Sequence, residues 1–246
     1  MPYNINFDEL AIKTNIATDR LQNNIKTYDA MAKLFPALET EGQKVGLYGG
    51  TALNKVYFGK KQRLSYDLGI FCYSYETTLS VLKKHGATQV LAKMAPMKIE
   101  NTRFMFQDIR LDLWEVKGKP IEAPQKREAT DLLYYYNYLI PKIAIPTYSL
   151  EYLLAEKTIA MADRNELKDI YDTWTGLQIL KDEAKYGRLL KLVSKKRGIS
   201  DYLHYLRIQT YVINKNLDYY KEKKIDVLYQ PDVGAMMKDI GAALKL

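Results

Sequence analysis

The chain has little of the chemistry that cysteine and histidine supply. Among its 246 residues, Cys72 is the single cysteine, and His85 and His204 are the only histidines. A lone cysteine can form neither an intramolecular disulfide nor a cysteine-based metal site. The two histidines lie in separate amphipathic segments, and no surrounding residues match the motifs of Ser-His-Asp hydrolases. We therefore expect neither a disulfide scaffold nor histidine-assisted nucleophilic catalysis.

Long apolar runs are also missing. No window approaches the roughly 18 uncharged apolar residues that a membrane helix requires. Asp8, Glu9 and Lys13 interrupt the N-terminal segment before it could form the apolar core of a signal peptide. These absences predict a cytoplasmic protein without a membrane partner.

Basic residues outnumber acidic ones. The chain has 37 Lys and Arg against 29 Asp and Glu, a formal charge of +8 and a pI near 9.2. This excess favours a polyanionic partner, because cations that neutralise phosphates release counterions. The 21 tyrosines suit either base stacking or half-buried packing. The basic runs 191–197 and 221–224 are candidate nucleic-acid contacts, and they equally suit a solubilising surface.

A glycine pair marks the first candidate site. Gly49 and Gly50 follow a strand predicted over residues 44–48, and a helix is predicted over 51–58. Glycines let backbone N–H groups approach a phosphate, and a helix N-terminus favours negative charge. Thr51 adds a hydroxyl at the same place. The same pair also occurs in ordinary strand-to-helix turns, so its meaning depends on the residues that follow.

Two carboxylates follow on predicted strands. Asp67 lies in the strand-like run 66–73, and Asp112 stands between two leucines in the run 104–116. Side chains alternate across a strand, so Asp112 points away from its leucine neighbours. A buried carboxylate is costly unless a cation neutralises it. Asp67 and Asp112 are therefore predicted ligands of Mg²⁺ (or Mn²⁺), which would hold a nucleoside triphosphate substrate.

The order of these motifs resembles that of the AbiEii-type nucleotidyltransferase toxins of toxin–antitoxin and abortive-infection systems, within the DNA polymerase β-like superfamily. Four separate elements between residues 40 and 175 carry the resemblance. They are Gly49-Gly50-Thr51-Ala52-Leu53 with Tyr57, Arg63-x-Ser65-x-Asp67, Asp112, and the helical motif with Glu156, Lys157, Arg164, Lys168, Asp169, Tyr171 and Asp172.

The resemblance implies a site and a reaction. Gly49, Gly50 and Thr51 would hold the terminal phosphates with Ser65, and Asp67 and Asp112 would hold the metal. The reaction would transfer a nucleoside monophosphate from a nucleoside triphosphate to an RNA hydroxyl, at the 3′ end of a tRNA, with release of pyrophosphate. An antitoxin protein is the partner that the family implies.

The helical motif adds cations to this site. Lys157 and Arg164 are seven residues apart, so they lie on one helix face two turns apart. By resemblance, Lys157 would contact the phosphates, and Arg63 or Arg164 would offset charge that develops in the transition state. Asp169 or Asp172 would orient Lys157 or act near the acceptor hydroxyl. If the helix continued, Lys168 would extend this row and Asp172 would lie close to it, whereas a break near Asn165 would fold the second half of the motif back. A solvated charged face is the alternative to a site.

One residue departs from the family pattern. The second motif normally ends Asp-x-Asp, but Gly69 stands at the second acidic position. Three explanations stay open: a degenerate enzyme, a relocated ligand such as Asp108, or an inactivating substitution. A catalytically impaired nucleotide-binding or RNA-binding relative is therefore the alternative function. A small-molecule nucleotidyltransferase of the antibiotic-modifying kind is a third.

The fold class predicted is α+β. A nucleotidyltransferase-like domain, residues 1–125, would hold a mixed sheet with flanking helices, and a helical domain would follow over residues 126–246. The expected elements of the first part, besides those above, are helices over 8–35 and 76–84 and strands over 89–93, 97–106 and 109–116. The second part would begin with a connection over 126–146 and continue with helices over 149–162, 166–180, 186–194, 201–216 and 233–244.

Overall fold

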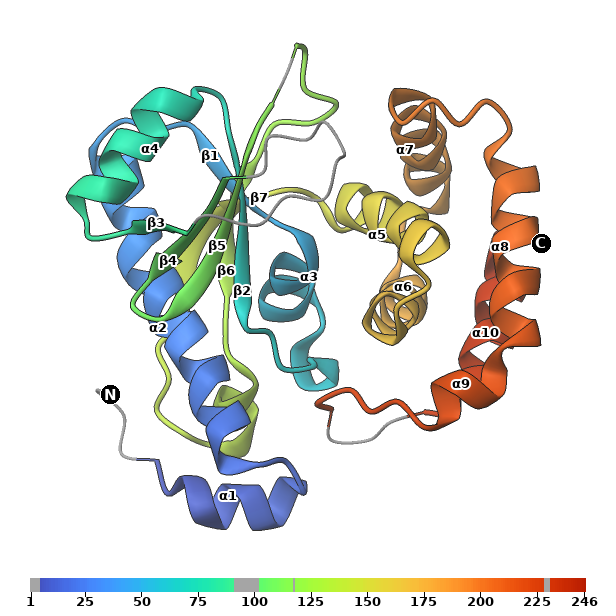
Figure 1. The fold of residues 1–246 in the computed structure, drawn as a ribbon, viewed down its shortest axis with the longest axis horizontal. Helices are drawn as coiled ribbons and strands as arrows, with labels where there is room; N and C mark the ends of the chain where they lie inside the picture. Colours follow the sequence, from blue (N-terminus) through green and yellow to red (C-terminus); the bar gives the residue numbers. More distant parts are fainter. Residues whose placement is uncertain (1–4, 91–101, 117, 228–230) are drawn as a thin grey trace.

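A mixed sheet of seven strands forms one side of the molecule, and a group of helices forms the other (Figure 1). The structure, a computed structural model, describes residues 5–90, 102–116, 118–227 and 231–246. The strand order is β3-β4-β5-β2-β1-β7-β6, in which β2 pairs with β5 and β1 with β7 in parallel, while the other pairs are antiparallel. The strands are β1 (Val45–Tyr48), β2 (Asp67–Cys72), β3 (Thr88–Val90), β4 (Thr102–Phe106), β5 (Ile109–Glu115), β6 (Gln125–Ala129) and β7 (Ile143–Thr147).

Helices cover both faces of the sheet. Helices α2 and α4 lie on one face, and α3 lies on the other, between the sheet and the C-terminal helices (Figure 1). The α-helices are α1 (Phe7–Thr14), α2 (Thr18–Thr40), α3 (Gly49–Ala52), α4 (Tyr75–Lys84), α5 (Leu150–Arg164), α6 (Leu167–Ile179), α7 (Glu183–Lys196), α8 (Tyr202–Lys215), α9 (Leu217–Lys221) and α10 (Val233–Leu244). A π-helix, η1 (Leu53–Tyr57), continues α3, and two 3₁₀ segments are η2 (Gly59–Lys61) and η3 (Leu132–Tyr136).

Helix α2 packs against the face of the sheet that it shares with α4 (Figure 1). Its apolar residues recur every three or four positions, and those at 21, 25, 28, 31, 34, 35 and 38 are buried. The single helix expected over 8–35 is wrong, since Asn15, in the left-handed conformation with φ 55°, ends α1 before α2 begins. Pro36 lies inside α2 without ending it. The α+β class and the central strands are confirmed.

The sheet contains two strands that the sequence pattern did not predict. Residues 126–146 were expected as a connection, but β6 and β7 form an antiparallel pair, and β7 joins β1 through the register Leu47↔Thr147. Strand β6 is an edge strand of largely charged residues, and β7 contains Pro146, so neither has the apolar alternation of a typical strand. The sheet thus runs past residue 125, where we expected the helical part to begin. Part of the expected strands over 89–93 and 97–106 falls on residues 91–101, outside the described ranges.

The C-terminal helices begin directly after β7. The Ser149 hydroxyl accepts a hydrogen bond from the Tyr152 backbone N–H at 3.3 Å, which caps α5. The five helices expected after residue 148 are present, and α9 is an additional short one. Among the described residues, no helix combines the length and the apolar character that crossing a bilayer requires.

Candidate active site

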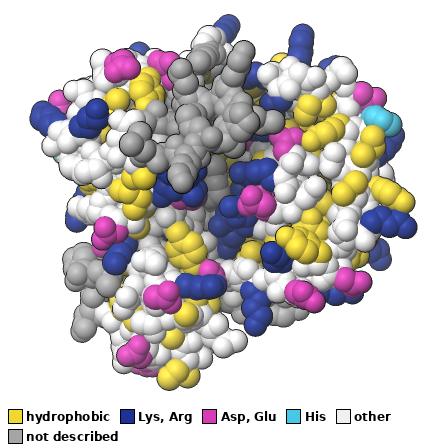
Figure 2. All heavy atoms as spheres, in the orientation of Figure 1, with side chains coloured by type: hydrophobic (Ala, Val, Ile, Leu, Met, Phe, Trp, Pro, Cys, Tyr) yellow, Lys and Arg dark blue, Asp and Glu magenta, His cyan; other side chains and the backbone are white. Residues whose placement is uncertain are grey.

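A basic hollow separates the sheet from the helices. Lys and Arg side chains gather in it in the space-filling view (Figure 2). A cavity of about 490 Å³ lies there, lined by the glycine turn, the start of β2, the middle of β5, helix α5, the start of α6 and residues 224–226. Segments far apart in the sequence therefore meet at one place.

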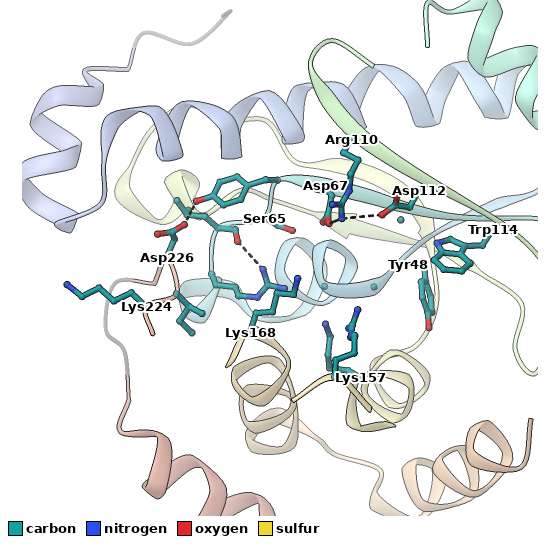
Figure 3. A pocket seen from close by; sticks show the side chains of 18 residues that line it. Tyr48, Ser65, Asp67, Arg110, Asp112, Trp114, Lys157, Lys168, Lys224 and Asp226 are labelled. Atoms are coloured by element: carbon teal, nitrogen blue, oxygen red, sulfur yellow. Dashed lines mark hydrogen bonds and ion pairs between the residues drawn. The ribbon is translucent and has the colours of Figure 1, made fainter. Parts of the chain in front are cut away.

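Asp67 and Asp112 face this cavity from neighbouring strands. Strands β2 and β5 pair in parallel with the register Asp67↔Arg110 and Gly69↔Asp112. Because side chains alternate, these residues share one face of the sheet, and all four line the cavity together with Gly49. Arg110 reaches both acids (Figure 3): its Nη2 atom lies 2.5 Å from Asp67 Oδ2 and 3.2 Å from Asp112 Oδ2.

This arrangement does not fit the expected divalent metal. Asp112 is also bonded by a second arginine, since Arg103 Nε lies 3.2 Å from its Oδ1 atom. Gly69 leaves the second acidic position of the Asp-x-Asp motif without a carboxylate. Within the described ranges, no group of three or more His, Cys, Asp or Glu side chains is placed to hold a metal ion. Asp108, the alternative ligand, lies in the β4–β5 turn with φ 65° and does not line the cavity.

The two glycines of the turn have different reasons to be glycine. Gly49 has φ 80°, a conformation that other residues rarely adopt. A Cβ atom on Gly50 would lie 2.3 Å from Arg63 Nη2 and 3.2 Å from Asp172 Oδ2. Gly50 therefore makes room for a buried ion pair behind the turn, a role that the sequence did not indicate.

Thr51 and Ser65 join the turn to strand β2. The Thr51 hydroxyl donates to the Asp67 carbonyl at 2.5 Å and shares a hydrogen bond of 2.5 Å with the Ser65 hydroxyl. Thr51 is buried and does not line the cavity, whereas Ser65 does. In this structure the Thr51 hydroxyl thus fixes the backbone of a cavity carboxylate and does not itself line the cavity.

A buried network of charges forms the opposite wall. Arg63 makes a bidentate pair with Asp172, with Nε–Oδ1 at 2.9 Å and Nη2–Oδ2 at 2.7 Å. Lys157 Nζ lies 2.7 Å from Asp169 Oδ1 and 3.0 Å from Asp172 Oδ2. Arg164 Nη2 lies 2.8 Å from Asp169 Oδ2. The three cations line the cavity and the two acids do not, so the acids orient the cations from behind.

The charge states of this network follow from its contacts. Burial alone would raise the pKa of Asp172, but the adjacent charges of Arg63 and Lys157 outweigh it and hold the pKa below its ordinary value. Burial also opposes the charge on Arg63, and Asp172 outweighs that effect and raises the arginine pKa. Both groups therefore stay charged at neutral pH.

A helix break brings the network together. Asn165 adopts the left-handed conformation with φ 52° and ends α5 directly after Arg164. Helix α6 then turns back, so Asp169 and Asp172, one turn apart, both face Lys157. The break near Asn165 was one of the two arrangements left open by the sequence, and it is the one observed.

The chain is similar to proteins of a known family. Residues 34–246 match the family described as the nucleotidyl transferase AbiEii toxin of type IV toxin–antitoxin systems. The chain belongs to this family. It is a nucleotidyltransferase by that membership, as the motifs indicated. No curated protein matches the chain at a significant level.

Solved structures of low sequence identity share the fold of this AbiEii-family chain. The MenT4 nucleotidyltransferase toxin from Mycobacterium tuberculosis H37Rv has 15% identity and a TM-score of 0.56, over 98% of this chain and 99% of its own. The antibiotic-resistance factor ANT(2'')-Ia has 12% identity and a TM-score of 0.51, over 74% of this chain and 98% of its own. At these identities the likeness concerns the fold alone.

Several residues of the AbiEii-family site were missed in the sequence. Arg110 stands two positions before Asp112, so strand alternation could have placed it on the same face. No local sequence pattern marked Asp226 as a residue of the site. Its backbone carbonyl accepts from the Leu64 N–H at 2.8 Å, and its carboxylate contacts Tyr66 and Arg20, so these contacts hold residues 224–226 in the cavity wall.

A second cavity adjoins the first. It has a volume of about 530 Å³ and shares Tyr48, Gly49, Trp114, Lys157 and Arg164 with its neighbour. Its walls combine aromatic rings with cations and with two acids, Glu156 and Asp163, which both pair with Arg197. The Tyr48 and Phe71 rings stack at 3.9 Å between centroids, and the aromatic wall continues through Trp114 (Figure 3), while Lys196 and Arg197 also line the cavity.

Proposed function

We propose that the basic cavity binds a nucleoside triphosphate and that the protein transfers its nucleoside monophosphate to an RNA hydroxyl. The observation that carries this proposal is the charge of the cavity wall, where six cations and three acids are found among the residues that the structure describes. The cations are Arg63, Arg110, Lys157, Arg164, Lys168 and Lys224, and the acids are Asp67, Asp112 and Asp226. Such an excess favours a polyanion of the size of a triphosphate.

The cations differ in what they can offer a phosphate. Arg164 and Lys168 have side chains that are 48% and 44% exposed, so they can turn toward a ligand. Lys157 is held by two buried carboxylates with its ammonium facing the cavity (Figure 3). A cation fixed in this way needs no reorganisation when charge develops on the transferring phosphoryl group.

The transfer itself forms one bond and breaks one. The acceptor oxygen bonds to the α-phosphorus, and the bond between the α-phosphorus and its bridging oxygen breaks, so that pyrophosphate leaves with the electron pair. The acceptor proton passes to Asp67, which is more exposed than Asp112, at 40% against 20% of the side chain. The contribution of the protein is otherwise positioning and electrostatic stabilisation.

The second cavity supports an RNA acceptor. Aromatic faces hold unpaired bases by stacking, at about 1–3 kcal/mol per base. Lys196 and Arg197 of the first basic run line this cavity, and Lys221, Lys223 and Lys224 of the second run line a further one with Arg20. Single-stranded RNA ends, such as the 3′ end of a tRNA, combine exposed bases with a polyanionic backbone. We therefore propose tRNA as the acceptor.

The direct test supplies each α-labelled nucleoside triphosphate with total tRNA, or with an aminoglycoside, under buffers with and without Mg²⁺. We expect label in tRNA with the wild-type protein and with Lys84→Met, a matched charge loss on α4. Lys157→Met should lose the label while its circular dichroism shows a folded chain. Label in the aminoglycoside alone would contradict the RNA proposal.

Gly69 supports a second candidate function. With one carboxylate fewer than the family motif, the protein would bind nucleotide or RNA without transferring anything. Equilibrium dialysis separates this case from the first: triphosphate would bind with the same dependence on Lys157, but neither label in RNA nor pyrophosphate would appear in any buffer.

Membership in a toxin–antitoxin family supports an antitoxin protein as partner, and both partner and RNA would be met in the cytoplasm. Co-expression with the product of a neighbouring gene tests this. We expect that product to restore growth of cells that express the toxin. An unchanged growth defect, with both proteins present at similar levels, would contradict the proposed partner.

A further inference from the structure

An arginine stands between the two carboxylates that the family motif assigns to a metal. We infer that Arg110 takes the place of a divalent cation between Asp67 and Asp112, so that the cavity binds its nucleotide without a metal ion. The inference rests on the proposed function only in treating this cavity as the nucleotide site. The exclusion of the ion rests on the arrangement of the arginines themselves.

The contacts leave little for an ion to bind. One nitrogen of Arg110, Nη2, approaches an oxygen of each carboxylate, at 2.5 Å for Asp67 and 3.2 Å for Asp112. Arg103 approaches the other oxygen of Asp112 from β4, at 3.2 Å. Both oxygens of Asp112 are thus bonded to guanidinium groups, and Mg²⁺ could enter only by displacing them.

The formal charges of the two carboxylates and the two arginines also cancel. Asp67 and Asp112 carry two negative charges, and Arg103 and Arg110 carry two positive ones. A divalent ion is attracted to a site by its uncompensated negative charge, and Mg²⁺ in particular gives up its hydration water reluctantly. The two carboxylates and two arginines therefore offer a divalent ion no oxygen of Asp112 that is free of a guanidinium contact, and no net negative charge to attract it.

Strand register keeps Arg110 in this position. Residues 67, 69, 110 and 112 share one sheet face, and Arg110 is paired with Asp67 across the β2–β5 ladder. Gly69 is paired with Asp112 and leaves the neighbouring place empty of any side chain. Its surroundings are close: a Cβ atom there would lie 3.0 Å from the Tyr48 carbonyl oxygen. The missing carboxylate and the added guanidinium thus occur side by side.

The test is Mn²⁺ binding, measured by the loss of the free-ion signal in electron paramagnetic resonance. We expect wild type to bind Mn²⁺ weakly and Arg110→Gln to bind it at least tenfold more tightly, because Asp67 is released and Asp112 keeps only its contact with Arg103. Arg103→Gln is the matched control, since it removes the same charge but leaves Arg110 on both acids, and it should change the affinity less. Equal Mn²⁺ affinity in wild type and folded Arg110→Gln would overturn the inference.

A second measurement uses the wild-type protein alone. We expect the dissociation constant of a nucleoside triphosphate to be the same, within about twofold, in Mg²⁺ and in EDTA. A tenfold loss of affinity in EDTA would overturn the inference even if Arg110→Gln does not fold. Absence of nucleotide binding in every buffer would instead contradict the proposed function, and the Mn²⁺ comparison would still decide the role of Arg110.

Discussion

Gly50 is the residue on which the buried charges of the site depend most directly. A side chain there meets the Arg63 guanidinium at 2.3 Å. We expect Gly50→Ala to move Arg63 off Asp172 and to lower the free energy of unfolding by about 2–4 kcal/mol, because a buried bidentate pair is disrupted. Urea unfolding measures this. Gly187→Ala in α7, where a Cβ atom meets nothing within 4 Å, is the control and should change stability by less than about 1 kcal/mol.

Asp172 makes the stability of the fold depend on pH. Its pKa lies below the ordinary carboxyl value because Arg63 and Lys157 outweigh its burial. A carboxylate of this kind contributes stability that is present above its unfolded pKa of about 3.9 and is lost as pH falls through the lower folded value. We expect Asp172→Asn to be less stable than wild type at pH 7, with a difference that narrows below about pH 4. A difference that stays constant from pH 7 to about pH 2.5 would contradict this account.

Substitutions at Gly69 distinguish two consequences of glycine at this position, namely the absence of a carboxylate ligand and the close packing against the Tyr48 carbonyl. A Cβ atom at this position must shift the Tyr48 carbonyl by a few tenths of an ångström, so Gly69→Ala and Gly69→Asp should both cost about 1–3 kcal/mol of stability. Only the aspartate supplies a carboxylate beside Asp112. We expect Gly69→Asp combined with Arg110→Gln to bind Mn²⁺ more tightly than Gly69→Ala combined with Arg110→Gln. Equal affinities would show that residue 69 does not reach the carboxylate pair.

At the scale of elements, a buried lysine fixes the motif helix, which consists of α3 and η1 (residues 49–57), to the rest of the fold. Lys55 of η1 bonds to Asp131 and, at 2.8 Å, to Asn24 of α2, and neither Lys55 nor Asp131 has an exposed side chain. Burial lowers the lysine pKa, and the charge of Asp131 opposes that shift. The glycine turn is thereby positioned from both α2 and the segment that precedes η3.

We expect Lys55→Met to lower the free energy of unfolding by about 3–5 kcal/mol, because it leaves Asp131 buried without its cation. The double variant Lys55→Met with Asp131→Asn should recover part of this loss, since the neutral amide is less costly to bury. Urea unfolding of both variants measures the coupling. A double variant no more stable than Lys55→Met would contradict the ion-pair account.

The helices and strands of this fold differ in how well sequence patterns predict them. Strands β1 and β2, the motif helix and α5 were predictable because apolar periodicity, glycines and the Ser149 cap agree. Strands β6 and β7 were not, because β6 is an edge strand of largely charged residues and β7 contains Pro146, which is atypical of a strand inside a sheet. The contact of Asp226 with Leu64 joins segments that are far apart in the sequence, and no local pattern encodes such a pairing. Arg110 could have been recognised from the sequence, because alternation along β5 places it on the same face as Asp112. That it also lies beside Asp67 follows only from the β2–β5 register.

At the scale of the molecule, ion pairs and hydrogen bonds connect segments on different sides of the cavity. The Arg63–Asp172 pair links the start of β2 to α6, and Asp226 links the C-terminal segment to α2 and to the residues before β2. The protein carries an overall charge of +8, and two basic runs flank the cavities. This distribution favours a long polyanion that passes from one cavity to the next.

Salt dependence tests this distribution. We expect Lys221→Gln, Lys223→Gln and Lys224→Gln together to weaken tRNA binding. The slope of log K against log salt should fall by about 0.7 for each phosphate of single-stranded RNA that these lysines neutralise in the wild-type complex. Lys33→Gln, Lys83→Gln and Lys84→Gln on α2 and α4 form the control with the same net charge. Equal slopes for the two triple variants would mean that the RNA does not follow this side of the molecule.

The claim that the cations between sheet and helices hold a triphosphate is tested most directly by equilibrium binding of a labelled nucleoside triphosphate. The account predicts that Lys157→Gln and Lys168→Gln each weaken binding at least about tenfold, or about 1.4 kcal/mol, while Lys84→Gln binds like wild type and all three remain folded by circular dichroism. Unchanged affinity in Lys157→Gln and Lys168→Gln would contradict it, because the nucleotide would then lie elsewhere.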